Sequence, residues 1–299
     1  MALGSGLRGL VKHRWTYLAL APTFVFVGVF LVYPVVDAIV KSFFEWRMRA
    51  FYDPRFVGMA NYVEILSDPM FWRSCRVLLV FMGRWLVVTF GVVLPVTYLV
   101  YKLGDSGLGR VFRNLYVVPM MVPMMVITLY WRFFYEPNFG MLNNLLQMVG
   151  LDQMTRVWLG EVETALPALV FMEFPWVHGF PFLVLLAGLQ GIDESLHEAS
   201  DLDGATAAQK LFRVDLPMII PQIKILLVLG TIATIQQFHV QLIMTNGGPA
   251  YSTTVPGLMM YQQAFAFGKL GYGAAIGVIL FVTILLATVL LNRTLRRAD

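Results

Sequence analysis

Six long apolar runs constrain the fold of this chain more than any other feature of its 299 residues. Crossing the hydrocarbon layer of a bilayer takes roughly 20 helical residues, so each run of this length is a candidate transmembrane segment. Backbone groups in lipid must find partners within their own segment, which favours helices over isolated strands. The sequence therefore predicts an all-α integral membrane protein with six transmembrane helices. These are expected at residues 17–40, 77–101, 115–135, 165–189, 218–238 and 272–291.

The composition excludes several other classes of protein. Hydrophobic residues make up 58% of the chain and charged residues 13%, which argues against a water-soluble core. The single cysteine, Cys75, excludes an intrachain disulfide and a metal cluster built on thiolates. The sequence contains no Walker A string, G-x-x-x-x-G-K-[ST], so the chain cannot hydrolyse ATP in P-loop fashion by itself. We expect no cofactor in this chain, and its net charge of +4 does not imply nucleic acid as a partner.

Basic residues indicate the orientation, because cytoplasmic segments of membrane proteins carry an excess of Lys and Arg. A layout with both termini inside places these basic residues in the cytoplasm: Arg8, Lys12, Arg14, Lys102, Arg110, Arg113, Lys210, Arg213, Arg293, Arg296 and Arg297. The bias is weak overall and rests on the two termini and the second loop. We therefore predict a cytoplasmic N-terminus at residues 1–16, a six-helix domain at residues 17–291 and a cytoplasmic C-terminus at residues 292–299.

Two prolines four residues apart, Pro119 and Pro123, stand near the start of the third run. Proline removes a backbone donor and kinks a helix, and helix bundles use such kinks to open a cavity. The alternative is that both are ordinary membrane-helix prolines whose freed groups are satisfied by neighbouring helices.

A polar stretch interrupts the membrane pattern between the fourth and fifth runs. It reads EASDLDGATAAQKLFRVDLP, from Glu198 to Pro217. Asp203-Gly204 is a turn signal, since glycine adopts the positive φ that a sharp bend requires. Apolar residues recur at a spacing of three on both sides of this turn, which indicates a short helix on each side. The stretch is therefore expected to form a compact helix–turn–helix at the cytoplasmic face.

This stretch resembles the "EAA" loop of permease subunits of binding-protein-dependent ABC importers, whose pattern runs roughly E-A-A-x-x-D-G-A and then F-x-x-x-x-L-P. The residues that fall on the pattern are Glu198, Ala199, Asp203, Gly204, Ala205, Phe212, Leu216 and Pro217. The resemblance implies a type I ABC importer permease fold, in which residues 190–217 form a coupling helix that docks in a groove of the ATP-hydrolysing subunit. Composition alone would favour a merely solvated connector, but the residue order favours docking.

The same resemblance implies partners and a location. The partners are a second homologous permease subunit, two ATP-binding cassette subunits that carry ATP and Mg, and an extracytoplasmic solute-binding protein. The location is the cytoplasmic (inner) membrane of a bacterium, with the chain in contact with membrane lipid. The chain itself is then a transport subunit and not an enzyme.

The fifth run ends in an amide pair, Gln236 and Gln237, followed by Phe238 and then by the string TNGGP at residues 245–249. This resembles the first membrane subunit of maltose-type importers, where an Asn-Asn pair before Phe lines the sugar site. Amides suit that role because they offer donors and an acceptor to hydroxyl groups without carrying charge.

The fourth run carries a second such resemblance. Trp176 and Phe180 precede AGLQ at residues 187–190, similar to a W-x-x-x-F run that leads to A-G-L-Q-x-I in the family. Together the two regions imply a carbohydrate substrate. The residues expected along its pathway are Gln236, Gln237, Trp176, Phe180 and His239.

Charged and polar residues inside the apolar runs leave an alternative open. Glu173, His178 and His239 could carry protons in a secondary transporter or channel that needs no ATP-binding partner. For Arg84 and Lys224 structural pairing or snorkelling is the favoured interpretation. If either side chain turned toward the pathway, an anionic substrate would be favoured.

Overall fold

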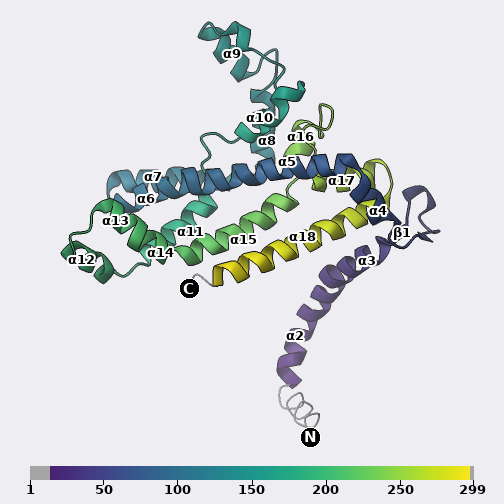
Figure 1. Cartoon of the computed structure of the whole chain (residues 1–299), viewed down its shortest axis with the longest axis horizontal. Coiled ribbons are helices and arrows are strands. Elements are labelled where there is room, and N and C mark those ends of the chain that lie inside the picture. Colours follow the sequence, from purple (N-terminus) through teal and green to yellow (C-terminus); the bar gives the residue numbers. More distant parts are fainter. Residues whose placement is uncertain (1–13, 297–299) are drawn as a thin grey trace. The chain divides into compact units, whose positions relative to one another are not determined.

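The computed structural model describes residues 14–296, which divide into two compact units (Figure 1). One unit comprises the residues up to Ser67 together with Met260–Ile279, and the other comprises Asp68–Met259 together with the residues from Leu280 onward. Arg8, Lys12 and Arg297, used above to predict the orientation, lie outside the described residues.

The smaller unit combines a long apolar helix with a short hairpin. Its elements up to Ser67 are α2 (Arg14–Val27), η1 (Gly28–Val32), α3 (Tyr33–Lys41), β1 (Phe44–Glu45), η2 (Met48–Ala50), β2 (Arg55–Phe56) and α4 (Ala60–Ser67). The two strands pair antiparallel, with Phe44 opposite Phe56. Asn61 on α4 donates to the carbonyls of Ser42 at 2.8 Å and Phe44 at 3.1 Å, so one amide fixes the hairpin to the end of α3.

The larger unit is helical throughout. Its first elements are α5 (Pro69–Leu86), η3 (Val87–Val93), α6 (Leu94–Lys102), α7 (Gly107–Val117), η4 (Val118–Met121), α8 (Met124–Phe134), α9 (Met141–Met148), η5 (Asp152–Met154), α10 (Val162–Phe171) and α11 (Gly179–Gln190). They are followed by α12 (Glu194–Leu202), α13 (Ala207–Lys210), η6 (Leu211–Asp215), α14 (Leu216–Met218), α15 (Ile220–Gln236) and α16 (His239–Met244). The last elements are α17 (Pro256–Tyr261), η7 (Gln262–Ala266) and α18 (Leu270–Arg296). The boundary between the two units falls once within α17 and once within α18.

Four helices of the described residues are long and apolar enough to cross a membrane: Leu18–Lys41, Pro69–Lys102, Ile220–Met244 and Leu270–Arg293. They correspond to the first, second, fifth and sixth predicted spans. Figure 1 shows the second of them as α5, η3 and α6 running on without a break. A multi-pass helical membrane protein is thus confirmed, with four spans of this kind, or up to five if one bent helix pair is counted.

The third and fourth predicted spans are not continuous helices. In the third, the helix of Gly107–Met121 meets α8 at a bend of 94°, where Pro119 and Pro123 remove backbone donors. In the fourth, residues 172–178 separate α10 from α11. Glu173 and Trp176 in this break have positive φ angles of 70° and 58°, which no regular right-handed helix accommodates. The kink expected from the two prolines is confirmed, and the fourth predicted span is instead two short helices.

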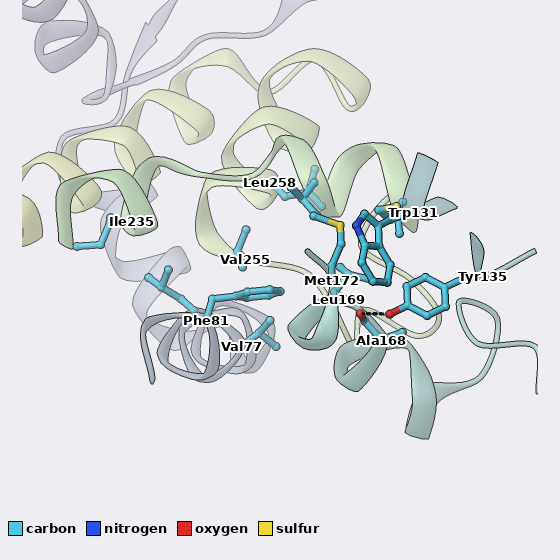
Figure 2. Close-up of a cluster of buried hydrophobic side chains, with 13 residues drawn as sticks. Val77, Phe81, Trp131, Tyr135, Ala168, Leu169, Met172, Ile235, Val255 and Leu258 are labelled. Carbon is cyan, nitrogen blue, oxygen red and sulfur yellow. Dashed lines mark hydrogen bonds between the residues drawn. The ribbon is translucent and has the colours of Figure 1, made fainter. Parts of the chain in front are cut away.

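A cluster of buried side chains holds the broken helices to the long ones (Figure 2). Phe81 of α5, Trp131 of α8 and Leu169 of α10 are all members of it. Tyr135, just beyond α8, donates its hydroxyl to the carbonyl of Ala168 on α10 at 2.9 Å, the dashed line in Figure 2. The short helices α8 and α10 therefore take their position from side-chain packing as well as from chain connectivity.

One close approach links α5 to α15. The indole ring of Trp85 lies directly against Gly230, where an added Cβ atom would overlap the six-membered part of the ring. Small residues allow such contacts between membrane helices because they leave room for the neighbouring helix. Gly230 is thus required by packing.

Replacing Gly230 with alanine is expected to reduce the free energy of unfolding by about 1–3 kcal/mol, because the Trp85 ring must leave its site. Thermal unfolding of the detergent-purified protein measures this loss. Gly83→Ala is the matched control, since Gly83 lies on the same helix as Trp85 and has no atom within 4 Å of an added Cβ. Alanine at position 83 should leave the midpoint temperature of unfolding unchanged or raise it. Equal midpoint temperatures for the two variants would contradict the packing argument.

Candidate functional site

The polar loop between the fourth and fifth predicted spans folds as a helix–turn–helix made of α12 and α13. Asp193 caps α12 by accepting the N–H of Ser195 at 2.9 Å, and hydrogen bonds from the Ser195 hydroxyl and N–H lower the pKa of Asp193. Gly204 has a φ of 69° at the turn, as its position after Asp203 predicts. Thr206 and Gln209 form a reciprocal capping box at the start of α13. Local sequence signals therefore account for the shape of the loop.

The loop presents most of the motif residues to solvent. Glu198, Ala199, Asp203, Gly204, Phe212 and Pro217 are exposed, whereas Ala205 and Leu216 are half-buried. Two large apolar side chains stand out in this polar segment, because Leu202 is 90% exposed and Phe212 is 67% exposed. Apolar side chains gathered on a polar surface are typical of a contact with another protein.

One ion pair joins the two helices of the loop to each other. Asp201 of α12 and Lys210 of α13 form an ion pair that closes the helix–turn–helix on itself. Glu194, Glu198 and Asp203 remain exposed on the same segment. The loop therefore exposes several acidic residues, and one basic residue, Arg213, is exposed next to Phe212.

A cavity of about 620 Å³ lies within the larger unit, where the helices are broken. Both breaks contribute to its wall: Pro119 and Val122 come from the third predicted span, and Glu173, Pro175 and His178 come from the fourth. The ring systems of Trp85, Trp131 and Phe180 also line it. The cavity thus combines flat aromatic faces with one carboxylate and one imidazole.

Arg84 organises the polar part of this cavity wall. Its Nη2 donates to the carbonyl of Met172 at 2.8 Å and to Oε2 of Glu173 at 2.9 Å. His178 Nε2 lies 3.2 Å from the same carboxylate oxygen. Arg84 and Glu173 are each only 14% exposed, so the pair is largely shielded from solvent. Arg84 therefore satisfies the carbonyl that follows α10 and also supplies the counter-charge of Glu173.

Of the residues predicted to line the substrate pathway, Phe180 lies in the cavity wall. Trp176 is not one of the lining residues. Its ring meets those of Phe171 and Phe174 edge-on, with centroids 5.8 and 5.3 Å away. Trp176 thus packs within the broken segment and beside the cavity.

The predicted polar cluster of the fifth span lies just beyond the cavity. Gln236 ends α15, Gln237 follows it, and His239 begins α16. Gln236 and His239 are exposed and Gln237 is half-buried. Ala233 lines the cavity, and its carbonyl accepts the N–H of Gln237 at 2.9 Å. The amide pair therefore lies one helical turn past the cavity wall.

Sequence reasoning noted Arg84 and Glu173 separately and did not pair them, because 89 residues separate them in the chain. It also missed Trp85 and Gly230, which are ordinary residues of an apolar run. Asp215 was overlooked because it falls between Phe212 and Leu216 at a position that the loop pattern leaves free.

Known proteins whose sequences are similar to this chain are membrane components of transport systems. The sequence profile of the family described as "Binding-protein-dependent transport system inner membrane component" matches residues 105–298. The trehalose/maltose transport system permease protein MalF of Thermococcus litoralis is 30% identical over 291 residues, covering 96% of each chain. The sulfoquinovosyl glycerol transport system permease protein SmoG of Agrobacterium fabrum is 29% identical over 289 residues, covering 94% of this chain and 90% of that protein.

A solved structure shares the fold. One chain of a bacterial ABC transporter involved in the import of the acidic polysaccharide alginate superposes with a TM-score of 0.81 at 24% identity. The match covers 97% of this chain and 98% of that one. The chain therefore shares its overall fold with a chain of that transporter.

Replacing Glu173 alone with glutamine is expected to destabilise the protein by about 3 kcal/mol, because the charge of Arg84 would stay buried without a counter-charge. The double variant Arg84→Gln with Glu173→Gln removes both charges, keeps an amide donor at position 84 for the Met172 carbonyl, and should recover more than half of that loss. Thermal unfolding in detergent measures both. Glu163→Gln, at an exposed site on α10, is the control, and an equal loss in the two Glu→Gln variants would contradict the pairing.

Proposed function

Because the chain belongs to the family of inner membrane components of binding-protein-dependent transport systems, we propose that it forms half of the pathway of an ATP-driven sugar importer. It is a permease subunit, and ATP is hydrolysed on a separate subunit. Its partners are a second homologous permease, two ATP-binding cassette subunits that carry ATP and Mg, and an extracytoplasmic solute-binding protein that delivers the sugar or oligosaccharide.

The exposed helix–turn–helix of α12 and α13 is the observation that carries this proposal. Leu202 at the end of α12 and Phe212 just after α13 are exposed, and the exposed charged residues of the same segment include Glu198, Asp203 and Arg213. An apolar pair with a charged rim suits a groove on a soluble subunit with basic residues at its edge. We assign residues 190–217 as the coupling segment that contacts an ATP-binding subunit.

Alternating access then follows from the link between this loop and the membrane helices. ATP binding would draw the two ATP-binding subunits together, and the coupling segments would move with them. The cavity would thereby change from inward-facing to outward-facing. This chain forms no covalent intermediate in that cycle.

The membrane topology proposed here has six spans with both termini in the cytoplasm. The third span comprises the two helices that meet at 94°, and the fourth comprises α10 and α11 with the break between them. Broken backbone at membrane depth is tolerated where it lines a cavity or is covered by protein, and both breaks line the same cavity.

The charges at the cavity favour a neutral sugar. Arg84 contacts Glu173 directly, so the pair contributes no net charge to the wall. The faces of Trp85, Trp131 and Phe180 are suited to stacking on sugar rings. The second carboxylate oxygen of Glu173 is suited to accepting a hydrogen bond from a sugar hydroxyl. Beside the cavity, Gln236, Gln237, Trp176 and His239 are assigned to the same pathway, further along it.

The first test is ATPase activity of the complex co-expressed with its chromosomal neighbours and reconstituted in liposomes. The candidate binding protein is added with maltose, trehalose or alginate pentasaccharide. We expect the neutral sugars to stimulate hydrolysis and the acidic oligosaccharide to have no effect. Stimulation by the acidic oligosaccharide alone would reject the neutral substrate class but keep the importer. Uptake driven by a pH gradient, with no co-purifying ATPase, would reject the importer and support the proton-coupled alternative.

A second test addresses the coupling segment. Gly204→Asp should uncouple ATP hydrolysis from uptake while the complex still assembles, because the new carboxylate alters the docking surface and an added Cβ meets no atom within 4 Å. The positive φ adds about 1 kcal/mol of local strain. Gly150→Asp is the control, since Gly150 also has a positive φ and open space but lies in the loop after α9. Normal uptake by the Gly204→Asp complex would count against the assignment.

A further inference from the structure

Asp215 is a fully buried carboxylate at the end of the coupling segment. Its side chain is 0% exposed, and the groups that interact with it include the hydroxyls of Tyr98 and Tyr101. An ionised carboxylate in such a place is expensive unless opposite charges compensate it. The position therefore requires an explanation beyond the packing of the loop.

Two basic side chains from two other helices face this carboxylate. Lys102, at the end of α6, places its Nζ 3.7 Å from Oδ2. His197, in the middle of α12, places its Nε2 3.6 Å from Oδ1. Both separations exceed an ordinary hydrogen bond. The Lys102 ammonium therefore attracts the carboxylate mainly by Coulomb interaction in a site shielded from water, and the His197 imidazole is a polar neighbour of the same carboxylate. Asp215 thus lies between the coupling helix and the end of the second span.

Aromatic rings hold both basic groups in place. The Lys102 ammonium lies 5.1 Å from the ring centre of Tyr98 and 5.2 Å from that of Tyr101, within the range of cation–π attraction. The hydroxyl of Tyr101 lies 3.2 Å from His197 Nε2. We call Asp215, Lys102, His197, Tyr98 and Tyr101 the Asp215 cluster. It joins α6, α12 and η6 through side chains alone.

We propose that Asp215 is a positioning residue that fixes the coupling segment to the cytoplasmic end of the second span, so that the two move together. This inference rests on the proposed function, because it assumes that the segment docks on an ATP-binding subunit. The other ion pair of the segment, Asp201 with Lys210, joins only α12 to α13 and reaches no span. Asp215 instead connects the loop to α6.

The second span carries such a movement to the cavity. Pro69–Lys102 is one helix of 34 residues, with Lys102 at one end and Arg84 and Trp85 near its middle. Trp85 lines the cavity, and Arg84 contacts Glu173 in its wall. At about 1.5 Å per residue, roughly 26 Å of helix connects the Asp215 cluster to Trp85. A displacement of the coupling segment can thereby reach the cavity through a single continuous helix.

The test is Asp215→Asn in the reconstituted complex, with the ratio of binding-protein-stimulated to basal ATPase activity as the readout. The probe is whichever of maltose, trehalose or alginate pentasaccharide stimulates the wild-type complex most. We expect this ratio to fall about fivefold or more, in the range of measured coupling effects. The thermal midpoint should stay close to that of the wild type, because asparagine has nearly the same shape as aspartate and Lys102, which is 43% exposed, keeps its charge in contact with water.

Asp105→Asn is the matched control. Asp105 also pairs with a basic residue, Arg113 at 3.1 Å, but it is 96% exposed in the loop after α6. The same substitution there should leave the stimulation ratio as in the wild type. An equal fall in both variants would overturn the proposal, because it would show a general effect of charge at this face.

A second variant keeps the proposal falsifiable if Asp215→Asn folds poorly. Lys102→Met removes the lysine counter-charge of Asp215 and should lower the stimulation ratio, whereas adding it to Asp215→Asn should lower the ratio little further. Independent, multiplicative effects of the two substitutions would overturn the pairing. A loss of basal and stimulated activity in proportion to lost assembly would overturn it in favour of a structural role. A wild-type complex without any stimulation would reject the proposed function itself, and the inference with it.

Discussion

The contact of Arg84 with the end of α10 is the interaction on which the membrane part of this protein depends. A helix that stops inside a bilayer exposes carbonyl groups that water cannot reach. Arg84 supplies the missing donor at Met172 and neutralises Glu173 with the same nitrogen. The break between α10 and α11 is tolerated because a charged side chain from another helix supplies a donor at the end of α10. The cavity lies beside that break for the same physical reason.

The two buried carboxylates of the larger unit are held in different ways. Glu173 has partners at 2.9 and 3.2 Å, within hydrogen-bond distance. The nearest basic atoms to Asp215 lie at 3.6 and 3.7 Å; the first belongs to His197 within the coupling segment and the second to Lys102 at the end of α6. A directly bonded pair resists rearrangement, whereas a pair held by Coulomb attraction tolerates small shifts of its members. The first arrangement suits a fixed wall and the second suits a moving joint.

The sequence predicts the class of this fold well and the continuity of its helices less well. Hydropathy locates four of the spans, and the Asp-Gly turn with its flanking stripes predicts the helix–turn–helix, because these signals are local. It does not predict that residues 172–178 leave the helix, since that outcome depends on a donor from Arg84, 88 residues away in the chain. Trp176 illustrates the same limit. The sequence does not predict that its ring packs against those of Phe171 and Phe174, because this contact forms in a non-helical segment, where Trp176 has a φ of 58°.

The dual role of Arg84 has an evolutionary consequence. Substituting Glu173 by a neutral residue would leave the broken helix capped but would expose an arginine charge next to the cavity. One such change would alter both the stability of the protein and the charge of the ligands it admits. A substitution at this pair therefore changes ligand selectivity and the stability of the fold together. A protein that comes to bind anionic ligands through loss of Glu173 must first accumulate stabilising substitutions at other positions.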